Sequence, residues 1–385
     1  MLDTDLHHVL LDWTQPTDVI ARAIRQHEHA PGVIDHIGGH SYYLHGVHEE
    51  DHLRGVPGRI VAWRGDAICR ATGDGALWIT HLRAASAPPG EQSFKLPATH
   101  LLRAHLRRAH VPQSMWAIAA RPTGRTYREL RYDEANGVGY LHFEFLNGAL
   151  STEHCRALLQ AYRHALRRPT RVIVLMGGQR AWCNGIHLNV IEAAPSPADE
   201  SWLNIHAIND VARAIICTES HLVVAALAAN AGAGGAMLAL GADRVVAHEQ
   251  VVLHPHYRTM GGLHGSEYWT YVLPRRVGAR RARQLTTECK ALRADEALAL
   301  GVVDELIGSD GAALRAHIGT WAEALAAHAD FEHWLRHKRL RRASDEAAKP
   351  LQSYRQEELS RMWDNFYGAD PGYHLARRRF VRKAA

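Results

Sequence analysis

The sequence is poor in the residues that build disulfide frameworks and zinc sites. It has only five cysteines in 385 residues, and no two of them form a Cys-x-x-Cys pair. Zinc sites usually need such pairs, and small secreted proteins usually carry more cysteine. Residues 1–15 include acidic side chains and no long apolar run, so we expect no signal peptide. These absences predict a protein of a reducing compartment, the cytoplasm, with no zinc site.

Lysine is also scarce. The chain has 5 lysines, so 40 of the 45 basic residues are arginine, and the net charge is +5. The arginines are scattered apart from clusters within residues 336–342 and 377–383. Such clusters can meet a polyphosphate or RNA, or they can be solvated helix faces. Since the arginine bias runs along the whole chain, it marks no nucleic-acid surface, and we expect no nucleic-acid partner.

One uncharged stretch, residues 222–242, is long enough to cross a membrane. However, Gly232, Gly234 and Gly235 fall in its middle, beside Asn230. Glycines in that position are typical of a turn between a buried strand and a buried helix. The stretch therefore predicts a strand, a turn and a helix of a globular core, and we expect no membrane partner.

Residues 1–100 show short apolar runs separated by turn residues, a pattern typical of a small β-barrel. Residues 101–127 contain two prolines and some helical spacing, and we interpret them as a connector. Four short motifs lie in order in residues 27–32, 57–60, 73–75 and 95–98. In this order they resemble the C-terminal barrel of the formyltetrahydrofolate-dependent formyltransferases. The Asn, His and Asp set of that family's catalytic domain is absent here. We therefore expect no productive binding of folate by this chain alone.

The pattern changes near residue 128. Residues 172–175 are a short apolar run typical of a strand buried on both faces, and a glycine-rich loop follows. Residues 222–242 repeat this strand, turn and helix. The repetition predicts an α/β domain at residues 128–310, built as a spiral of ββα units. Residues 311–385 are mostly helical in pattern, with large aromatic residues, and we expect a C-terminal extension that docks on the domain.

Each glycine loop ends where a helix is expected, at Gly185-Ile186 and at Gly234-Gly235. Glycine lets the backbone approach a ligand closely and aim free N–H groups at it. Two such donors would form an oxyanion hole. Spacing alone is equally compatible with two ordinary tight turns, so this alternative stays open.

The residues of both loops resemble the crotonase superfamily, which includes the enoyl-CoA hydratases and isomerases. The first loop spans residues 181–188 and the second residues 230–243. This resemblance implies that the backbone amides of Ile186 and Gly234 hold the thioester carbonyl of a coenzyme A ester. Asn184, Gly185, His187 and Gly235 would then line the substrate. The two glutamates of a hydratase are replaced by Met237 and Tyr257. Methionine cannot move a proton, and tyrosine ionises only near pH 10, so ordinary hydration is not expected.

Residues 253–278 place one carboxylate, Glu267, among aromatic and histidine residues. A carboxylate in apolar surroundings loses hydration, which raises its pKa and lets it exchange protons near neutral pH. Alternatively, Glu267 is a solvated residue at the start of a short helix capped by Ser266. We also predict that His254, His256 and Trp269 contact substrate. His254 and His256 flank a proline and have no acidic partner at ligand spacing, so we predict no metal.

Further motifs resemble the HoxX-type family of hydrogenase maturation proteins, which joins a formyltransferase to a crotonase-like domain. They lie within residues 184–202, 254–278 and 349–381. The resemblance implies that formyl-CoA is decarbonylated to carbon monoxide for the nickel–iron site of a hydrogenase. Glu267 would relay the formyl proton, and Tyr257 would orient the formyl group or donate to sulfur. Two alternatives remain. One is another acyl-CoA isomerase or hydrolase, and the other is a binding subunit for a separate formyltransferase or a hydrogenase maturation protein.

Overall fold

The structure is a computed structural model that describes residues 10–28, 32–87, 90–115, 117–255 and 257–383. Contacts divide the chain into two units. The first comprises Met1–Arg128 with Arg379–Ala385, and the second is Glu129–Arg378. Each unit has its own hydrophobic core. Among the described residues, no helix is long and apolar enough to cross a membrane.

The first unit is barrel-like. Six strands form one antiparallel sheet in the order β1-β2-β5-β4-β3, with β6 paired to β5. Helix α1 contacts β2, and its face of Ile20, Ala21 and Ile24 packs into the core. The elements of this unit are α1 (Thr17–Gln26), β1 (Val33–Ile37), β2 (His40–Glu50), β3 (Ile60–Arg64), β4 (Ala67–Ala71), β5 (Ala76–Ala84), β6 (Leu96–Pro97), α2 (Ala98–Leu101) and α3 (Arg103–Arg108).

The second unit is built on a six-stranded sheet in the order β17-β14-β12-β10-β8-β7. All neighbours are parallel except the β7–β8 hairpin. The strands are β7 (Leu130–Ala135), β8 (Val138–Phe143), β10 (Val172–Leu175), β12 (Leu222–Leu227), β14 (Arg244–Ala247) and β17 (Glu305–Leu306). Strands β10 and β12 are buried at every residue, because helices cover both faces of a parallel sheet.

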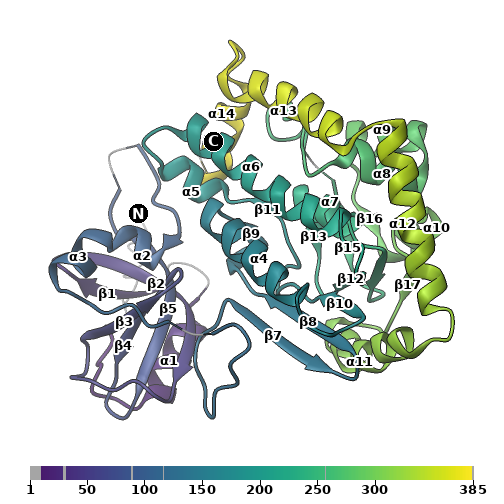
Figure 1. Ribbon diagram of the computed structural model, residues 1–385. Helices are drawn as coiled ribbons and strands as arrows, with labels where there is room; N and C mark the ends of the chain where they lie inside the picture. The colour runs from purple at the N-terminus through teal and green to yellow at the C-terminus, as the bar shows by residue number, and fades with distance from the viewer. Residues whose placement is uncertain (1–9, 29–31, 88–89, 116, 256, 384–385) are drawn as a thin grey trace. The chain divides into compact units, whose positions relative to one another are not determined.

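Helices α4 (Thr152–Ala165) and α6 (Pro197–Ile216) pack together, and α4 contacts the sheet at β7 and β8 (Figure 1). The core that includes Val174 and Val224 is covered by α11 (Gly311–Ala327) and α12 (Phe331–Ala348). Shorter elements complete this part: η1 (Leu146–Gly148), β9 (Ala149–Leu150), β11 (Gly185–Ile186), α5 (Leu188–Ala193), β13 (Ala231–Gly232), α7 (Gly234–Leu240) and β15 (Val252–His254). The uncharged stretch of residues 222–242 is thus strand, turn and helix, as the sequence predicted.

The rest of the unit consists of α8 (Trp269–Val277), α9 (Ala279–Glu288), β16 (Leu292–Arg293), α10 (Ala294–Ala299), α13 (Leu351–Tyr367) and the part of α14 (Gly372–Arg382) up to Arg378. The C-terminal helices are part of the packed structure. Helix α13 contacts α6 and α8, and the Tyr373 hydroxyl of α14 lies 2.8 Å from the Ser201 hydroxyl of α6. Arg377 and Glu192 form a buried ion pair at 3.0 Å. The predicted fold class, a crotonase-like core with an N-terminal barrel and a helical C-terminal region, is confirmed.

Candidate active site

The two glycine loops of the second unit lie against each other. The N–H of Trp182 donates to the Asn230 carbonyl at 2.8 Å, and the N–H of Gly232 donates to the Cys183 carbonyl at 2.9 Å. Gly185 has φ +80°, and a Cβ built on it would lie 3.1 Å from the backbone nitrogen of Gly234. The fold therefore brings together two loops that are about 50 residues apart, as the pair of glycine motifs predicted.

Gly234 is the first residue of α7, so its N–H has no partner within that helix. A Cβ built on Gly234 would lie 2.3 Å from Oε1 of Glu267. The carboxylate therefore packs directly on this glycine, and any side chain here would displace it. Ile186 lies in β11, which pairs with Leu150 of β9. The Glu267 carboxyl thus lies beside one of the two predicted amide donors.

Glu267 and Tyr257 form a buried pair. The Tyr257 hydroxyl donates to Oε2 of Glu267 at 2.8 Å, and the two residues are 5% and 1% exposed. Burial raises the pKa of Glu267 to about 7, although hydrogen bonds from Tyr257 and from the Ser266 backbone act in the opposite direction. Burial, together with the neighbouring Glu267 charge, raises the pKa of Tyr257 well above its ordinary value. At neutral pH the tyrosine is therefore a hydrogen-bond donor, while the carboxyl is poised to exchange a proton.

The prediction that Ser266 caps a short helix containing Glu267 is wrong. Glu267 and Tyr268 both lie in the left-handed region, with φ of 59° and 58°, and α8 begins only at Trp269. The Ser266 hydroxyl donates to Oδ1 of Asn209, which also accepts the Glu267 N–H at 2.8 Å. Two successive left-handed residues are costly, so the surrounding bonds must hold them in place. The turn aims the Glu267 side chain at Gly234 instead of along a helix.

A second buried carboxyl, Glu358 of α13, supplies the missing cap for α8. It accepts the N–H of Tyr268 at 3.0 Å, the N–H of Thr270 at 2.9 Å and the Thr270 hydroxyl at 2.5 Å. Glu358 is fully buried, and burial raises its pKa to about 8, with the Glu267 charge acting in the same direction. Sequence reasoning missed this residue. The only signal was a glutamate on the apolar side of an amphipathic helix, next to Leu359.

The other residues predicted in the first loop have different environments. Asn184 is exposed, and its amide donates to the Asn147 carbonyl at 2.7 Å. His187 is buried and caps α5, because its Nδ1 accepts the N–H of Val190 at 3.3 Å. A Cβ built on Gly235 would lie 2.0 Å from the Cys183 carbonyl oxygen, so Gly235 allows the loops to pack closely. His187 and Gly235 therefore shape the backbone of the site.

His254 lies in β15, where its backbone carbonyl accepts the N–H of Ala233 at 2.8 Å. Its Nε2 lies 2.7 Å from the Cys289 carbonyl, which ties the ring to the protein. His256 lies outside the described residues. Trp269 is partly buried, and its ring lies 5.4 Å from that of His264. The Trp269 indole N–H is buried and has no acceptor among the described residues, so a ligand could use it.

Three further residues bear on the surroundings of the site. Met237, predicted from the sequence to replace a glutamate of the hydratases, is 1% exposed and lies in α7. Trp182 is a core residue whose indole N–H donates to the Leu175 carbonyl at 3.3 Å. Trp202 packs edge-on against Trp363 of α13, with ring centres 5.1 Å apart. Glu267, Tyr257 and Met237 are all buried, with exposures of 1%, 5% and 1%.

Comparison with known proteins identifies the families of both parts of the chain. Residues 133–365 match the family model described as enoyl-CoA hydratase/isomerase, and residues 7–93 match the formyl transferase C-terminal domain. The chain is similar to a protein named hydrogenase maturation factor HoxX from Bradyrhizobium diazoefficiens. The identity is 47% over 374 residues, which is 97% of this chain and 63% of that protein.

Solved structures give the same result. A crystal structure of HypX from Aquifex aeolicus, in complex with tetrahydrofolic acid, matches with TM-score 0.92 and 39% identity, over 97% of this chain and 65% of that one. An enoyl-CoA hydratase from Bacillus halodurans matches with TM-score 0.56 and 20% identity, over 65% of this chain and 98% of that one, and supports the fold alone. The chain spans about two thirds of the HoxX and HypX proteins. Its second unit carries the paired glycine loops of the crotonase fold, and the chain belongs to the enoyl-CoA hydratase/isomerase family.

Proposed function

We propose that this chain decarbonylates formyl-CoA to carbon monoxide and coenzyme A during assembly of the nickel–iron site of a hydrogenase. The observation that carries the proposal is the buried Glu267–Tyr257 pair, 2.8 Å apart and packed on Gly234. The similarity to a protein named hydrogenase maturation factor also supports it. Coenzyme A enters as the carrier of the acyl group.

The residues present fit this reaction better than hydration. Hydration across a double bond uses two carboxylates, and here Met237 occupies one position and Tyr257 the other. A single buried carboxyl with a pKa of about 7 can both accept and return one proton. Decarbonylation of a formyl thioester needs that sequence, because one proton leaves carbon and one reaches sulfur.

In the proposed reaction, the backbone N–H groups of Ile186 and Gly234 hold the formyl oxygen and polarise the carbonyl. Ionised Glu267 accepts the proton of the formyl C–H bond. The C–S bond then breaks, its electron pair leaves with the thiolate sulfur, and carbon monoxide is released. Glu267 returns its proton to the thiolate, so the products are carbon monoxide and the free thiol. The Tyr257 hydroxyl orients the Glu267 carboxylate through the 2.8 Å bond.

Two physical points favour this sequence of steps. A thiolate is a good leaving group, because the conjugate thiol has a pKa of about 8.5. Hydrolysis of the thioester is the competing reaction, and water must be kept from the carbonyl. The low exposure of Glu267 and Tyr257, 1% and 5%, serves that purpose. The steps draw only on groups of this chain and call for no metal.

The direct test incubates the purified chain with formyl-CoA and captures gas with reduced haemoglobin. We expect the Soret shift of the carbon monoxide complex and release of one thiol per molecule of gas. Wild-type protein that gives no shift above the blank contradicts the proposal. Thiol release without gas would instead indicate thioester hydrolysis.

A different reaction on the same fold is the second candidate, because the family also contains hydratases and isomerases of acyl-CoA esters. A panel of enoyl-CoA and acyl-CoA esters separates the two. Turnover of these esters, with none of formyl-CoA, would favour an isomerase or hydrolase. The Met237 side chain argues against a hydratase in that panel.

The barrel-like unit suggests how the chain is supplied with substrate. We propose that a formyltransferase, either in the same polypeptide or as a separate cytoplasmic protein, makes formyl-CoA for the site. The related HypX protein has been crystallised with tetrahydrofolic acid, and this chain spans 65% of it. A pull-down with the first unit as bait tests for such a partner or for hydrogenase maturation proteins. If the protein turns over formyl-CoA but retains neither, a purely binding role is excluded.

A further inference from the structure

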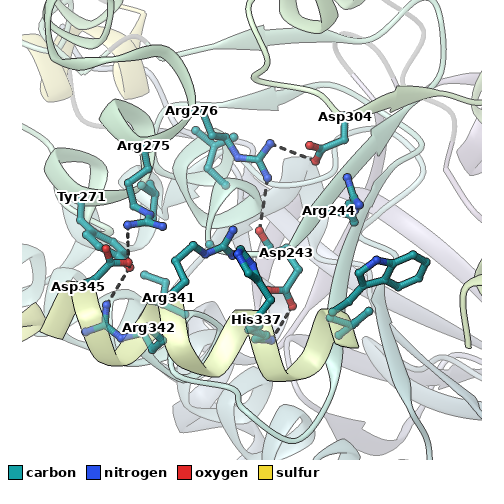
Figure 2. A pocket seen from close by; sticks show the side chains of 18 of the residues that line it. Asp243, Arg244, Tyr271, Arg275, Arg276, Asp304, His337, Arg341, Arg342 and Asp345 are labelled. Carbon is teal, nitrogen blue, oxygen red and sulfur yellow. Dashed lines mark hydrogen bonds and ion pairs between the residues drawn. The ribbon is translucent and has the colours of Figure 1, made fainter. Parts of the chain in front are cut away.

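A cavity lies in the same unit, lined by none of the residues of the candidate active site. It has a volume of about 440 Å³ and lies between α12 and the far ends of α7 and α8 (Figure 2). Helix α7 begins at Gly234 of the candidate active site, whereas Gly241 and Ala242, which follow its last turn, line this cavity. Seven helical residues span roughly 10 Å. The cavity is therefore separated from Gly234 by the length of α7.

The cavity wall carries more positive than negative charge. Its carboxylates are Asp243, Asp304 and Asp345. Its basic side chains are Arg244, Arg275, Arg276, Lys338, Arg341 and Arg342, with His337 beside them. Six cations against three anions leave an excess of three positive charges. In Figure 2, Arg341 and His337 reach up from α12 toward the wall that bears Asp243 and Arg276.

The three carboxylates are already used. Lys338 pairs with Asp243 at 2.5 Å, Arg276 pairs with Asp304 at 3.1 Å, and Arg275 pairs with Asp345. These pairs fix the walls of the cavity and neutralise three of the six cations. The acids therefore cannot also neutralise the remaining basic side chains.

The remaining cations are Arg244, Arg341 and Arg342. Arg342 is buried, donates to the Tyr271 hydroxyl at 2.8 Å and pairs with Glu346. Arg244 and Arg341 are exposed and have no hydrogen-bond or ion-pair partner among the described residues. The charge of Arg341 also lowers the pKa of neighbouring Lys338, an effect secondary to burial. Two guanidinium groups without a partner among the described residues thus line one cavity, and an anion bound there would be attracted to both.

We propose that this cavity binds a phosphate-bearing small molecule, with Arg244 and Arg341 as its principal ligands. Guanidinium forks bind phosphate oxygens through paired hydrogen bonds. A volume of about 440 Å³ is typical of small-molecule sites and exceeds what a single phosphate needs. Trp334 and Leu325 add apolar surface to the same cavity, which suits the organic part of a nucleotide-like molecule. The site does not depend on the reaction proposed at Glu267.

The phosphate groups have two sources: a free nucleotide, or the nucleotide end of coenzyme A. Titration calorimetry at low salt uses pyrophosphate, ADP and coenzyme A as probes. We expect saturable binding of pyrophosphate to the full chain, weakened by added salt. If ADP binds to protein already saturated with coenzyme A, the ligand of the cavity is a free nucleotide. If coenzyme A displaces pyrophosphate, the ligand is the nucleotide end of coenzyme A.

The variants Arg244→Gln and Arg341→Gln test the ligands. Each substitution removes charge-assisted hydrogen bonds to the phosphate. The loss of such a bond should weaken pyrophosphate binding about tenfold or more. Arg336→Gln is the matched control, since Arg336 is an exposed arginine on the same helix that does not line the cavity. It should change the affinity less than about twofold by the same reasoning. Because all three side chains are exposed, the melting temperature should stay unchanged.

Two outcomes overturn the proposal. One is wild-type protein that binds none of the three probes at low salt. The other is an Arg336→Gln variant that loses as much affinity as Arg341→Gln, which would show diffuse attraction to a basic surface. Either result is independent of turnover of formyl-CoA, so the fate of the proposed reaction does not affect the conclusion.

Discussion

Replacing Glu267 by glutamine separates a catalytic carboxyl from a structural one. The substitution keeps the shape of the side chain and one oxygen acceptor for the Tyr257 hydroxyl. In the wild-type protein this hydroxyl lies 2.8 Å from Oε2 of Glu267. It removes the basic oxygen that must take the formyl proton. Positioned proton transfer contributes about 10²–10⁴-fold to a rate, so turnover should fall by that order. Binding of a CoA ester should change little, because the amides of Ile186 and Gly234 are untouched.

Stability gives the contrasting readout. In wild type, burial raises the pKa of Glu267 to about 7, so at pH 8 the fold must hold a buried charge. Glutamine has no charge to bury. At pH 8 the Glu267→Gln variant should therefore melt at the same temperature as wild type or higher. A capping role would predict the reverse, a loss of about 1 kcal/mol in stability with normal turnover.

The dependence of turnover on pH tests the same assignment, because the direction of the change is predicted. If ionised Glu267 is the base, turnover rises with pH through an inflection near 7. The bond from Tyr257 lowers the pKa of Glu267, so Tyr257→Phe should move the inflection to higher pH. The cost to the maximal rate is that of one hydrogen bond, about 0.5–1.5 kcal/mol. A Glu267→Gln enzyme that retains near-normal carbon monoxide release, or an inflection unmoved in Tyr257→Phe, would refute the assignment.

Substitutions at Gly234, at Glu358 and in the Lys338–Asp243 pair, together with one pH titration, test other features of the structure. Gly234→Ala should cut turnover about 100-fold, because its Cβ would lie 2.3 Å from Oε1 of Glu267; normal kinetics would contradict that packing. Glu358→Ala should cost about 3 kcal/mol in chemical denaturation, because buried N–H donors lose their acceptor, and Glu358→Gln should recover part of it. Lys338→Met should cost about 3 kcal/mol by leaving Asp243 unpaired, and adding Asp243→Asn should restore stability in part. Glu267 and Glu358 have folded pKa values of about 7 and 8, above the ordinary 4.5, so the folded state holds extra protons and stability should fall as pH rises from 4.5 to 8. A flat stability profile across that range would contradict burial of these carboxyls.

The sequence predicted the elements whose cause is local. Gly185 and Gly234 sit where strands meet turns, and the fully apolar run of residues 222–227 predicts a strand buried on both faces. The burial of Glu267 was one of two open interpretations, since aromatic neighbours in sequence can equally lie on the surface of a helix. The hydrogen bond between Tyr257 and Glu267 could not be predicted from the sequence. The two residues are ten positions apart, and that spacing shows only that they lie in the same stretch of chain.

The errors arose where a distant segment decides the local structure. Ser266 has the residue type of a helix cap, but Asn209 takes its hydroxyl and Glu358 caps α8 from a helix 90 residues away. No pattern near Glu267 indicates two left-handed residues in succession. The cavity beside α12 was also hidden, because the chain's arginine surplus conceals which two guanidinium groups lack a partner.

The most direct measurement is carbon monoxide release from formyl-CoA by the purified chain, followed by the Soret band of reduced haemoglobin. We expect gas and free thiol in equal amounts from wild-type protein, and a loss of about 10²-fold or more in the Glu267→Gln variant. Wild-type protein that binds a CoA ester but releases no carbon monoxide would contradict the proposed function.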